Sequence, residues 1–310
     1  SPSPILRSWR LSRRSSHSKL KHGLSFSGLN KKIMNSKKAE IIRKELEENS
    51  GMILLKNFSQ ESVPTDPISW FLEFSRHIGT PVSQSEKGEF ILSIRNLGFE
   101  IDDPRTRGPN TNRKLGFHTD RCDVIGFLCL QEAKKGGENQ VVKSQEVEAI
   151  IRVERPDLHQ TLCLPFPYKR HVVDQGNPLP FCMQPVFSWK KNYFACSYLR
   201  VLIDRADADP ECPKLSPIQK EAINFFDEVC GRKEIQDRFT LSRGDLLFLN
   251  NWTTLHRRTS FEDWEDPGRK RHLLRVWLSM PNSRPLDESF RPNFGAVEAG
   301  ALRGGMPPSK

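Results

Sequence analysis

The chain has 310 residues, of which 36% are hydrophobic and 28% are charged, a composition typical of a globular protein. This length allows one elaborated β-rich domain with a sizeable core. The seven cysteines are scattered and form no CxxC pair, which argues against a disulfide framework or a zinc ribbon and favours a reducing, intracellular compartment. No apolar run is long enough for a signal peptide or a transmembrane helix.

The net charge of +10 is concentrated at the N-terminal end of the chain. Residues 1–39 contain ten Lys and Arg residues and no acid, whereas the remaining 38 basic residues match the 38 acidic ones. A neutral body argues against a nucleic-acid or membrane partner for the fold itself. We therefore predict a basic tail or transit-like segment over residues 1–35 and one folded domain over residues 36–310. We expect the protein in the cytoplasm, with the mitochondrion as the alternative.

Local patterns predict many strands and a few helices. One helix is expected to begin at Ser36, its N-cap, and to end before Gly51. The clearest helix has Ser216 as its N-cap, Pro217 at its first position and Gly231 just after its end. Strands are expected over 52–58, 90–95, 124–130, 140–143, 181–189, 192–199, 245–250 and 272–280, and further helices over 67–77 and 144–152. This pattern favours a mainly β fold whose double-sheet core is flanked by helices.

One imidazole and one carboxylate stand two positions apart at His118 and Asp120, between a polar loop and an apolar strand. In an extended chain such residues face the same side, so both can bind one divalent metal ion. The best third ligand is His256, which follows an apolar strand, and His171 is the fallback. Two histidines and one carboxylate with open positions are the ligand set of non-haem Fe(II) oxygenases. Alone, however, a His-x-Asp pattern also arises by chance, with the histidine capping a turn.

Two arginines, Arg271 and Arg275, stand four positions apart at the last predicted strand, which would place both on one face. Guanidinium groups that face a β core need anionic partners, because an unpaired buried charge is costly. Their planar fork matches a dicarboxylate. The alternative for Arg271 is plain solvated charge, as part of the basic run over residues 269–271.

These features occur in one order along the chain, together with three short motifs. The motifs are a Gly136-Gly137-Glu138 turn, an Arg243-Gly244-Asp245 strand entry, and Asn250-Asn251 before the second histidine. In this order they resemble the taurine dioxygenase family (TauD-like) of Fe(II)/2-oxoglutarate-dependent oxygenases. The resemblance covers roughly residues 50 to 306.

The resemblance implies a double-stranded β-helix, or jelly roll, and Fe(II) bound by His118, Asp120 and His256. It implies 2-oxoglutarate and O2 as cosubstrates, with release of succinate and CO2. Arg271 would hold the far carboxylate of 2-oxoglutarate, and Arg275 an anionic group of the substrate. Relatives carry Thr or Ser where this chain has Asn139, whose amide can also donate a hydrogen bond. The gap between His256 and Arg271 is longer than is common, so which arginine holds 2-oxoglutarate stays open.

The resemblance also implies a substrate pocket near the ligands. Residue type makes these side chains candidates for binding the substrate: Arg275, Asn96, Asn110, Asn112, Phe117 and Trp252. Amides with a second arginine suit a small carboxylate, such as an amino acid, that is hydroxylated, desaturated or cyclised. Two alternatives are an oxygenase acting on a macromolecule docked by the basic tail, and a catalytically silent binding module. An incomplete ligand set would mark the silent module, and here the set is complete.

Overall fold

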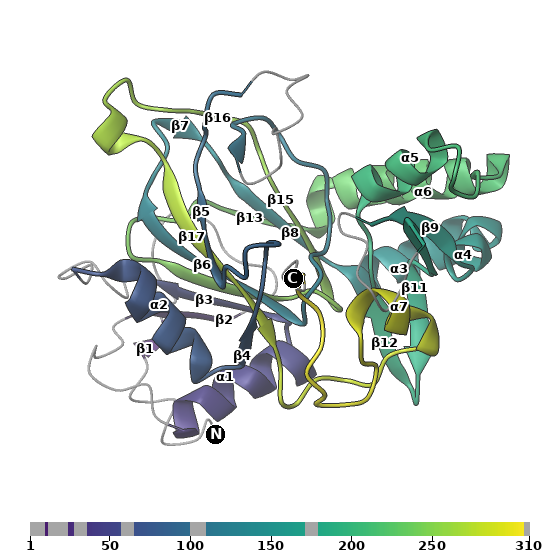
Figure 1. Cartoon of the computed structure of the whole chain (residues 1–310), viewed down its shortest axis with the longest axis horizontal. Helices are drawn as coiled ribbons and strands as arrows, with labels where there is room; N and C mark the ends of the chain where they lie inside the picture. Colours follow the sequence, from purple (N-terminus) through teal and green to yellow (C-terminus); the bar gives the residue numbers. More distant parts are fainter. Residues whose placement is uncertain are drawn as a thin grey trace.

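The computed structural model describes residues 10–11, 24–27, 36–56, 65–99, 110–170 and 179–306, and two β-sheets form its centre (Figure 1). The strands of the larger sheet are β1 (Arg10–Leu11), β2 (Leu24–Ser27), β3 (Met52–Lys56), β4 (Thr80–Val82), β5 (Ile91–Ile94), β6 (Val124–Gln131), β14 (Leu246–Asn250) and β17 (His272–Ser279). They follow the order β1-β2-β3-β14-β6-β17-β4, and β5 also pairs with β17. The smaller sheet, β13-β8-β15, contains β8 (Asn139–Lys143), β13 (Gln236–Phe239) and β15 (Thr254–Arg258).

The two sheets share one apolar core. Ile125 and Leu273 of the larger sheet and Val141 and Phe239 of the smaller sheet belong to the same buried cluster. Strand β14 lies between β3 and β6, and all five of its residues are buried, as its apolar run requires. The prediction of a mainly β fold with a double-sheet core and flanking helices is confirmed.

Helices α1 (Ser36–Glu48) and α2 (Pro67–Arg76) cover the outer face of the larger sheet. Leu46 of α1 and Phe71 of α2 are buried in one cluster with Phe248 of β14. The rings of Phe71 and Phe248 lie 6.4 Å apart. The apolar sides of both amphipathic helices are therefore packed on the face of β14 that points away from the small sheet.

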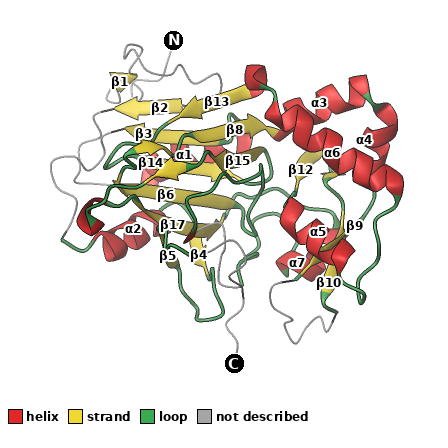
Figure 2. Ribbon diagram, turned by 90° about the horizontal axis from the view of Figure 1, so that it is seen from above, coloured by secondary structure: helices red, strands yellow, loops and turns green. Residues whose placement is uncertain are grey.

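A second group of elements lies at one end of the sheets (Figure 2). It consists of α3 (Ser144–Glu154), α4 (Pro156–Leu162), α5 (Arg200–Ala208), α6 (Pro217–Gly231), β9 (Phe166–Lys169), β10 (Phe181–Gln184), β11 (Phe187–Lys190) and β12 (Tyr193–Cys196). Val147, Leu158 and Phe226 are among the buried residues of its core. Ser216 is the N-cap of α6, as predicted, and forms a capping box with Gln219. The remaining short elements are β7 (Lys135–Gly136), η3 (Lys233–Ile235), β16 (Phe261–Glu262), η4 (Pro267–Arg269), η5 (Glu288–Phe290) and α7 (Arg291–Phe294).

Four local predictions need correction. Gly231 is the last residue of α6 and not the residue after its end, and the C-cap is Arg232. The run 181–189 is two strands, because Pro185 has no N–H to donate to a ladder; β10 pairs with β9, and β11 pairs with β12. Ser36 is the first residue of α1 and not its N-cap. Ser144 likewise begins α3, whose N-cap position is Lys143, and the Ser144 hydroxyl donates to the Trp252 carbonyl.

The division of the chain at residue 35 stays a prediction. Two short strands, β1 and β2, lie inside the segment predicted as a tail, and β2 pairs in parallel with β3. The fallback ligand His171 and loop residues 101–109 lie outside the described residues. Within the described ranges, no helix has the length and apolar character needed to cross a bilayer.

Candidate metal centre and cosubstrate pocket

The side chains of His118, Asp120 and His256 come together, with one possible ligand atom of each within 4.8 Å of the others. His256 Nε2 lies 3.4 Å, and His118 Nε2 3.8 Å, from the same carboxylate oxygen, Asp120 Oδ2. His256 lies on β15, and two reciprocal backbone hydrogen bonds of 3.1 Å join it to His118. Strand pairing therefore brings together the three residues that the sequence predicted as metal ligands.

The protonation of this cluster suits a metal cation. His118 Nδ1 donates to the Gly116 carbonyl at 2.9 Å, which leaves a lone pair on the Nε2 that faces Asp120. Burial, followed by the neighbouring His256, lowers the pKa of His118 to about 4, so the ring is neutral at pH 7. Burial opposes ionisation of Asp120, but Arg275 and the imidazoles offset it and lower the pKa of the carboxyl. Among the described residues, Asp120 Oδ2 has no hydrogen-bond partner, and a divalent cation would satisfy it.

Asn251 fixes the turn that carries the aspartate ligand. Its Oδ1 accepts the Asp120 backbone N–H at 2.9 Å, and its Nδ2 donates to Cys122 Sγ at 3.1 Å. The side chain is 1% exposed, so both contacts are shielded from water. The sequence singled out Asn251 only as part of a motif, and the structure shows what the amide does there.

Arg275, on β17, points to the same centre. Its Nη1 lies 3.7 Å from Asp120 Oδ1, and its Nε donates to Gln84 Oε1 at 2.7 Å. The Gln84 amide donates to the backbone carbonyls of Arg275 and Phe90, so it holds both the guanidinium and the strand. Sequence reasoning missed Gln84. No local signal marks it, because its partner lies 191 residues away along the chain.

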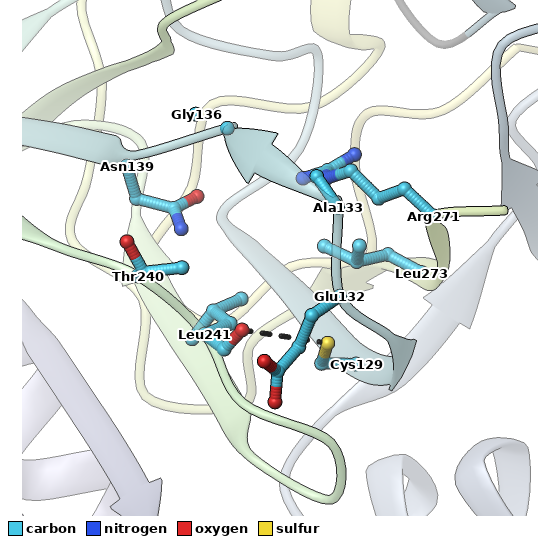
Figure 3. A pocket seen from close by; sticks show the side chains of 10 residues that line it. Cys129, Glu132, Ala133, Gly136, Asn139, Thr240, Leu241, Arg271 and Leu273 are labelled. Carbon is cyan, nitrogen blue, oxygen red and sulfur yellow. Dashed lines mark hydrogen bonds between the residues drawn. The ribbon is translucent and has the colours of Figure 1, made fainter. Parts of the chain in front are cut away.

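Arg271 lines a separate small pocket with Asn139 (Figure 3). The two side chains point toward this pocket from opposite walls, and Cys129, Leu241 and Leu273 complete its apolar part. Arg271 is only 5% exposed, so the alternative of solvated surface charge is wrong. Burial lowers the pKa of its guanidinium to about 10. Among the described residues, no carboxylate forms an ion pair with it, which leaves the charge available for an anion.

Three of the candidate substrate residues lie in loops that contact the chain after β5 and strand β16. Asn96 Oδ1 accepts the Gly98 N–H at 3.1 Å in a local turn. The Asn110 carbonyl accepts the Leu97 N–H, and the Asn112 carbonyl accepts the Phe261 N–H, each at 3.0 Å. These contacts use the backbone or a local turn. A role in binding substrate therefore stays a prediction for all three.

Two other candidates are corrected. The Phe117 side chain is 3% exposed and belongs to the core of the helical group, with the Arg257 guanidinium 4.2 Å from its ring centroid. In extended chain it points away from the side taken by His118. Trp252 is 1% exposed, packs against Phe294, and donates its indole N–H to Asp123. Neither ring has a free face for a substrate.

Arg121, the residue after Asp120, lines a second, wider pocket. Residues from β4, β10 and α7 and from the end of the described chain line it, among them Phe181, Met183 and Leu302. None of the six candidate substrate residues lines this pocket.

The two sheets, the His-Asp-His cluster and the arginine-lined pocket are the features of a jelly-roll non-haem Fe(II) oxygenase. Residues 21–277 match the family described as "Taurine catabolism dioxygenase TauD, TfdA family", and the chain belongs to that family. It is therefore a 2-oxoglutarate-dependent dioxygenase, an oxidoreductase that uses Fe(II), 2-oxoglutarate and O2. This family and the complete triad leave no support for the catalytically silent alternative.

Individual proteins are similar to the chain in sequence or in fold. The chain is 28% identical over 267 residues to FR-33289 synthase of Streptomyces rubellomurinus, covering 83% of this chain and 77% of the synthase. Asparagine oxygenase with Fe(II), 3-hydroxyasparagine and succinate has a similar fold, with a TM-score of 0.61 and 15% sequence identity. The similarity covers 79% of this chain and 78% of asparagine oxygenase. The non-haem iron oxygenase OrfP with Fe and alpha-ketoglutaric acid also has a similar fold, with a TM-score of 0.56 and 15% sequence identity. The similarity covers 79% of this chain and 80% of OrfP. The predicted jelly roll is confirmed by these folds.

Proposed function

We propose that the protein oxidises a small substrate that carries a carboxylate, such as an amino acid, by hydroxylation, desaturation or cyclisation. The observation that carries this proposal is Arg275, whose Nη1 lies 3.7 Å from the ligand residue Asp120. Its Nε donates a hydrogen bond to Gln84, whereas its Nη1 is directed at the candidate metal centre. This side of the guanidinium can bind a carboxylate there. The relative that is bound to 3-hydroxyasparagine supports an amino-acid-like substrate.

We assign Arg271 and Asn139 to the far carboxylate of 2-oxoglutarate. Support comes from the buried guanidinium that faces Asn139 across a small pocket, which Arg275 does not line. His118, Asp120 and His256 would hold Fe(II). When bound, Fe(II) and 2-oxoglutarate activate O2 to oxidise a substrate C–H bond.

Spectroscopy tests the metal and cosubstrate sites without a known substrate. Anaerobic addition of Fe(II) and 2-oxoglutarate should give a weak visible charge-transfer band. The band should be lost in His118→Ala and in Asp120→Ala, and kept in the matched control His159→Ala. His159 hydrogen-bonds Glu148 in the helical group, outside the triad. No band in the wild type would end the proposal.

Mass spectrometry tests the substrate class. A cell extract incubated with enzyme, Fe(II) and 2-oxoglutarate should yield a metabolite that gains one oxygen or loses two hydrogens. Once it is known, its amide or ester should turn over poorly, and Arg275→Ala should raise KM while the charge-transfer band persists. Equal turnover of the uncharged analogue, or an unchanged KM in Arg275→Ala, would refute a carboxylate held by Arg275.

A further inference from the structure

The turn that carries Asp120 is packed against the last described residues of the chain. The Gly305 N–H donates to the Arg121 carbonyl at 2.7 Å, and the Met306 N–H donates to the Ser83 carbonyl at 2.7 Å. Arg121 follows the aspartate ligand, and Ser83 precedes the residue that holds Arg275. We call residues 303–306 the C-terminal clamp, because they are hydrogen-bonded to both segments.

The close approach of the clamp requires glycine. Gly304 has a φ of +78°, and a Cβ added there would lie 2.6 Å from the Arg121 carbonyl oxygen and 3.1 Å from Cys122 Cα. A Cβ added to Gly305, with a φ of +77°, would lie 2.9 Å from the Ser83 carbonyl oxygen. Both the positive φ and the contact with backbone exclude a side chain. The clamp is therefore seated on the backbone next to the ligand.

Arg303 anchors the clamp at the other end of the same turn. Its side chain is 2% exposed, and its Nε donates to Asp123 Oδ1 at 2.7 Å. The same carboxylate accepts the Trp252 indole N–H and the Met280 backbone N–H, each at 2.8 Å. Removing one partner of a buried ion pair is strongly destabilising, so this contact fixes the end of the turn firmly.

We propose that the C-terminal clamp is a positioning element of the metal centre. It holds the backbone at Arg121 and at Asp123, so that Asp120 presents its carboxylate to the two histidines. Through Ser83 it also supports the segment that orients Arg275. None of its residues belongs to the His118, Asp120 and His256 cluster or to the six candidate substrate residues. The inference rests on the metal site described above, and it assigns a function to a segment distant from that site in sequence.

Gly304→Ala tests this role, with Gly295→Ala as the matched control. Gly295 also has a positive φ, +83°, but no atom lies within 4 Å of an added Cβ. Both variants should lose stability, because both force an L-residue into an unfavourable backbone conformation. Only Gly304→Ala should also weaken Fe(II) or Co(II) binding, by about 10-fold, as changes to groups that support a ligand do. Equal metal affinities in the two folded variants would overturn the proposal.

Hydrogen exchange of the wild-type protein gives a second test, which holds even if Gly304→Ala fails to fold. Anaerobic addition of Fe(II) should slow amide exchange in residues 303–306 together with residues 118–123. Helix α6, in the distant helical group, serves as the internal control and should not change. Protection of 118–123 with no change in 303–306 would show that the clamp is uncoupled from the metal centre. Absence of protection in both segments, or absence of metal binding, would instead count against the metal site itself.

Discussion

Replacing Arg271 with methionine separates cosubstrate binding from fold stability. The guanidinium is 5% exposed and, among the described residues, has no carboxylate ion-pair partner. A pKa of about 10, against an ordinary 12.5, corresponds to on the order of 3 kcal/mol of unfavourable burial. Methionine removes that charge at similar length, so the ligand-free variant should be as stable as the wild type or more stable. Loss of a buried contact to a carboxylate should weaken 2-oxoglutarate binding by about 3 kcal/mol, or about 100-fold.

Two measurements check the two halves of this prediction. Anaerobic titration of the Fe(II) protein with 2-oxoglutarate, followed by the charge-transfer band, gives Kd, and thermal denaturation of the metal-free protein gives Tm. Arg269→Met is the matched control, because Arg269 is an exposed arginine two residues away that stacks on Trp264. It should change neither value. The reasoning is refuted if Arg271→Met binds 2-oxoglutarate normally, or if Arg275→Met alone loses that binding.

Three further predictions concern stability and the basic tail. Burial, with the nearby Arg95, lowers the pKa of His272 to about 4, so His272 supports folding above pH 6.5 and loses this contribution as the pH falls to 4. For this partly exposed ring we expect a contribution of about 1 kcal/mol to the free energy of unfolding. In His272→Gln, the free energy of urea unfolding should therefore depend less on pH. Asp123→Asn should lower the free energy of unfolding by about 3–5 kcal/mol, measured with urea, because Arg303 keeps a buried charge. Changing the ten basic residues of 1–39 to Gln should leave turnover of the identified substrate intact; loss of turnover would favour a docked macromolecule.

The clustering of His118, Asp120 and His256 could be predicted from sequence because part of its signal is local and the ligand chemistry is restrictive. His118 and Asp120 share a face in any extended chain, and few histidines remained for the third position. The same rule could have prevented one error. Since neighbours in an extended chain face opposite sides, a Phe117 next to a ligand points into the core. Trp252 was misjudged because nothing in the sequence shows that its indole meets Asp123.

Other parts of the site depend on contacts that sequence patterns do not encode. Gln84 lies in an unremarkable polar stretch, and it acquires its role only when β17 brings Arg275 beside it. Arg271 lies just before β17, and the pairing register shifts between His272 and Leu273. Simple alternation along one regular strand is therefore not enough to place both arginines. The structure separates them by surroundings: one faces Asn139, the other faces Asp120.

Different segments of the chain support the surroundings of Arg271 and those of Arg275. The pocket of Arg271 is built from the end of β6, the turn before β8 and the chain after β13, and the C-terminal clamp does not line it. The clamp instead contacts the backbone beside Asp120, which is a candidate metal ligand. It also contacts the backbone beside Gln84, which holds the Arg275 guanidinium. Because these two supports share no residue, changes in the clamp should alter metal affinity and substrate orientation together, while the cosubstrate pocket stays intact. One segment can thus keep the metal and the substrate-directed arginine in register with each other.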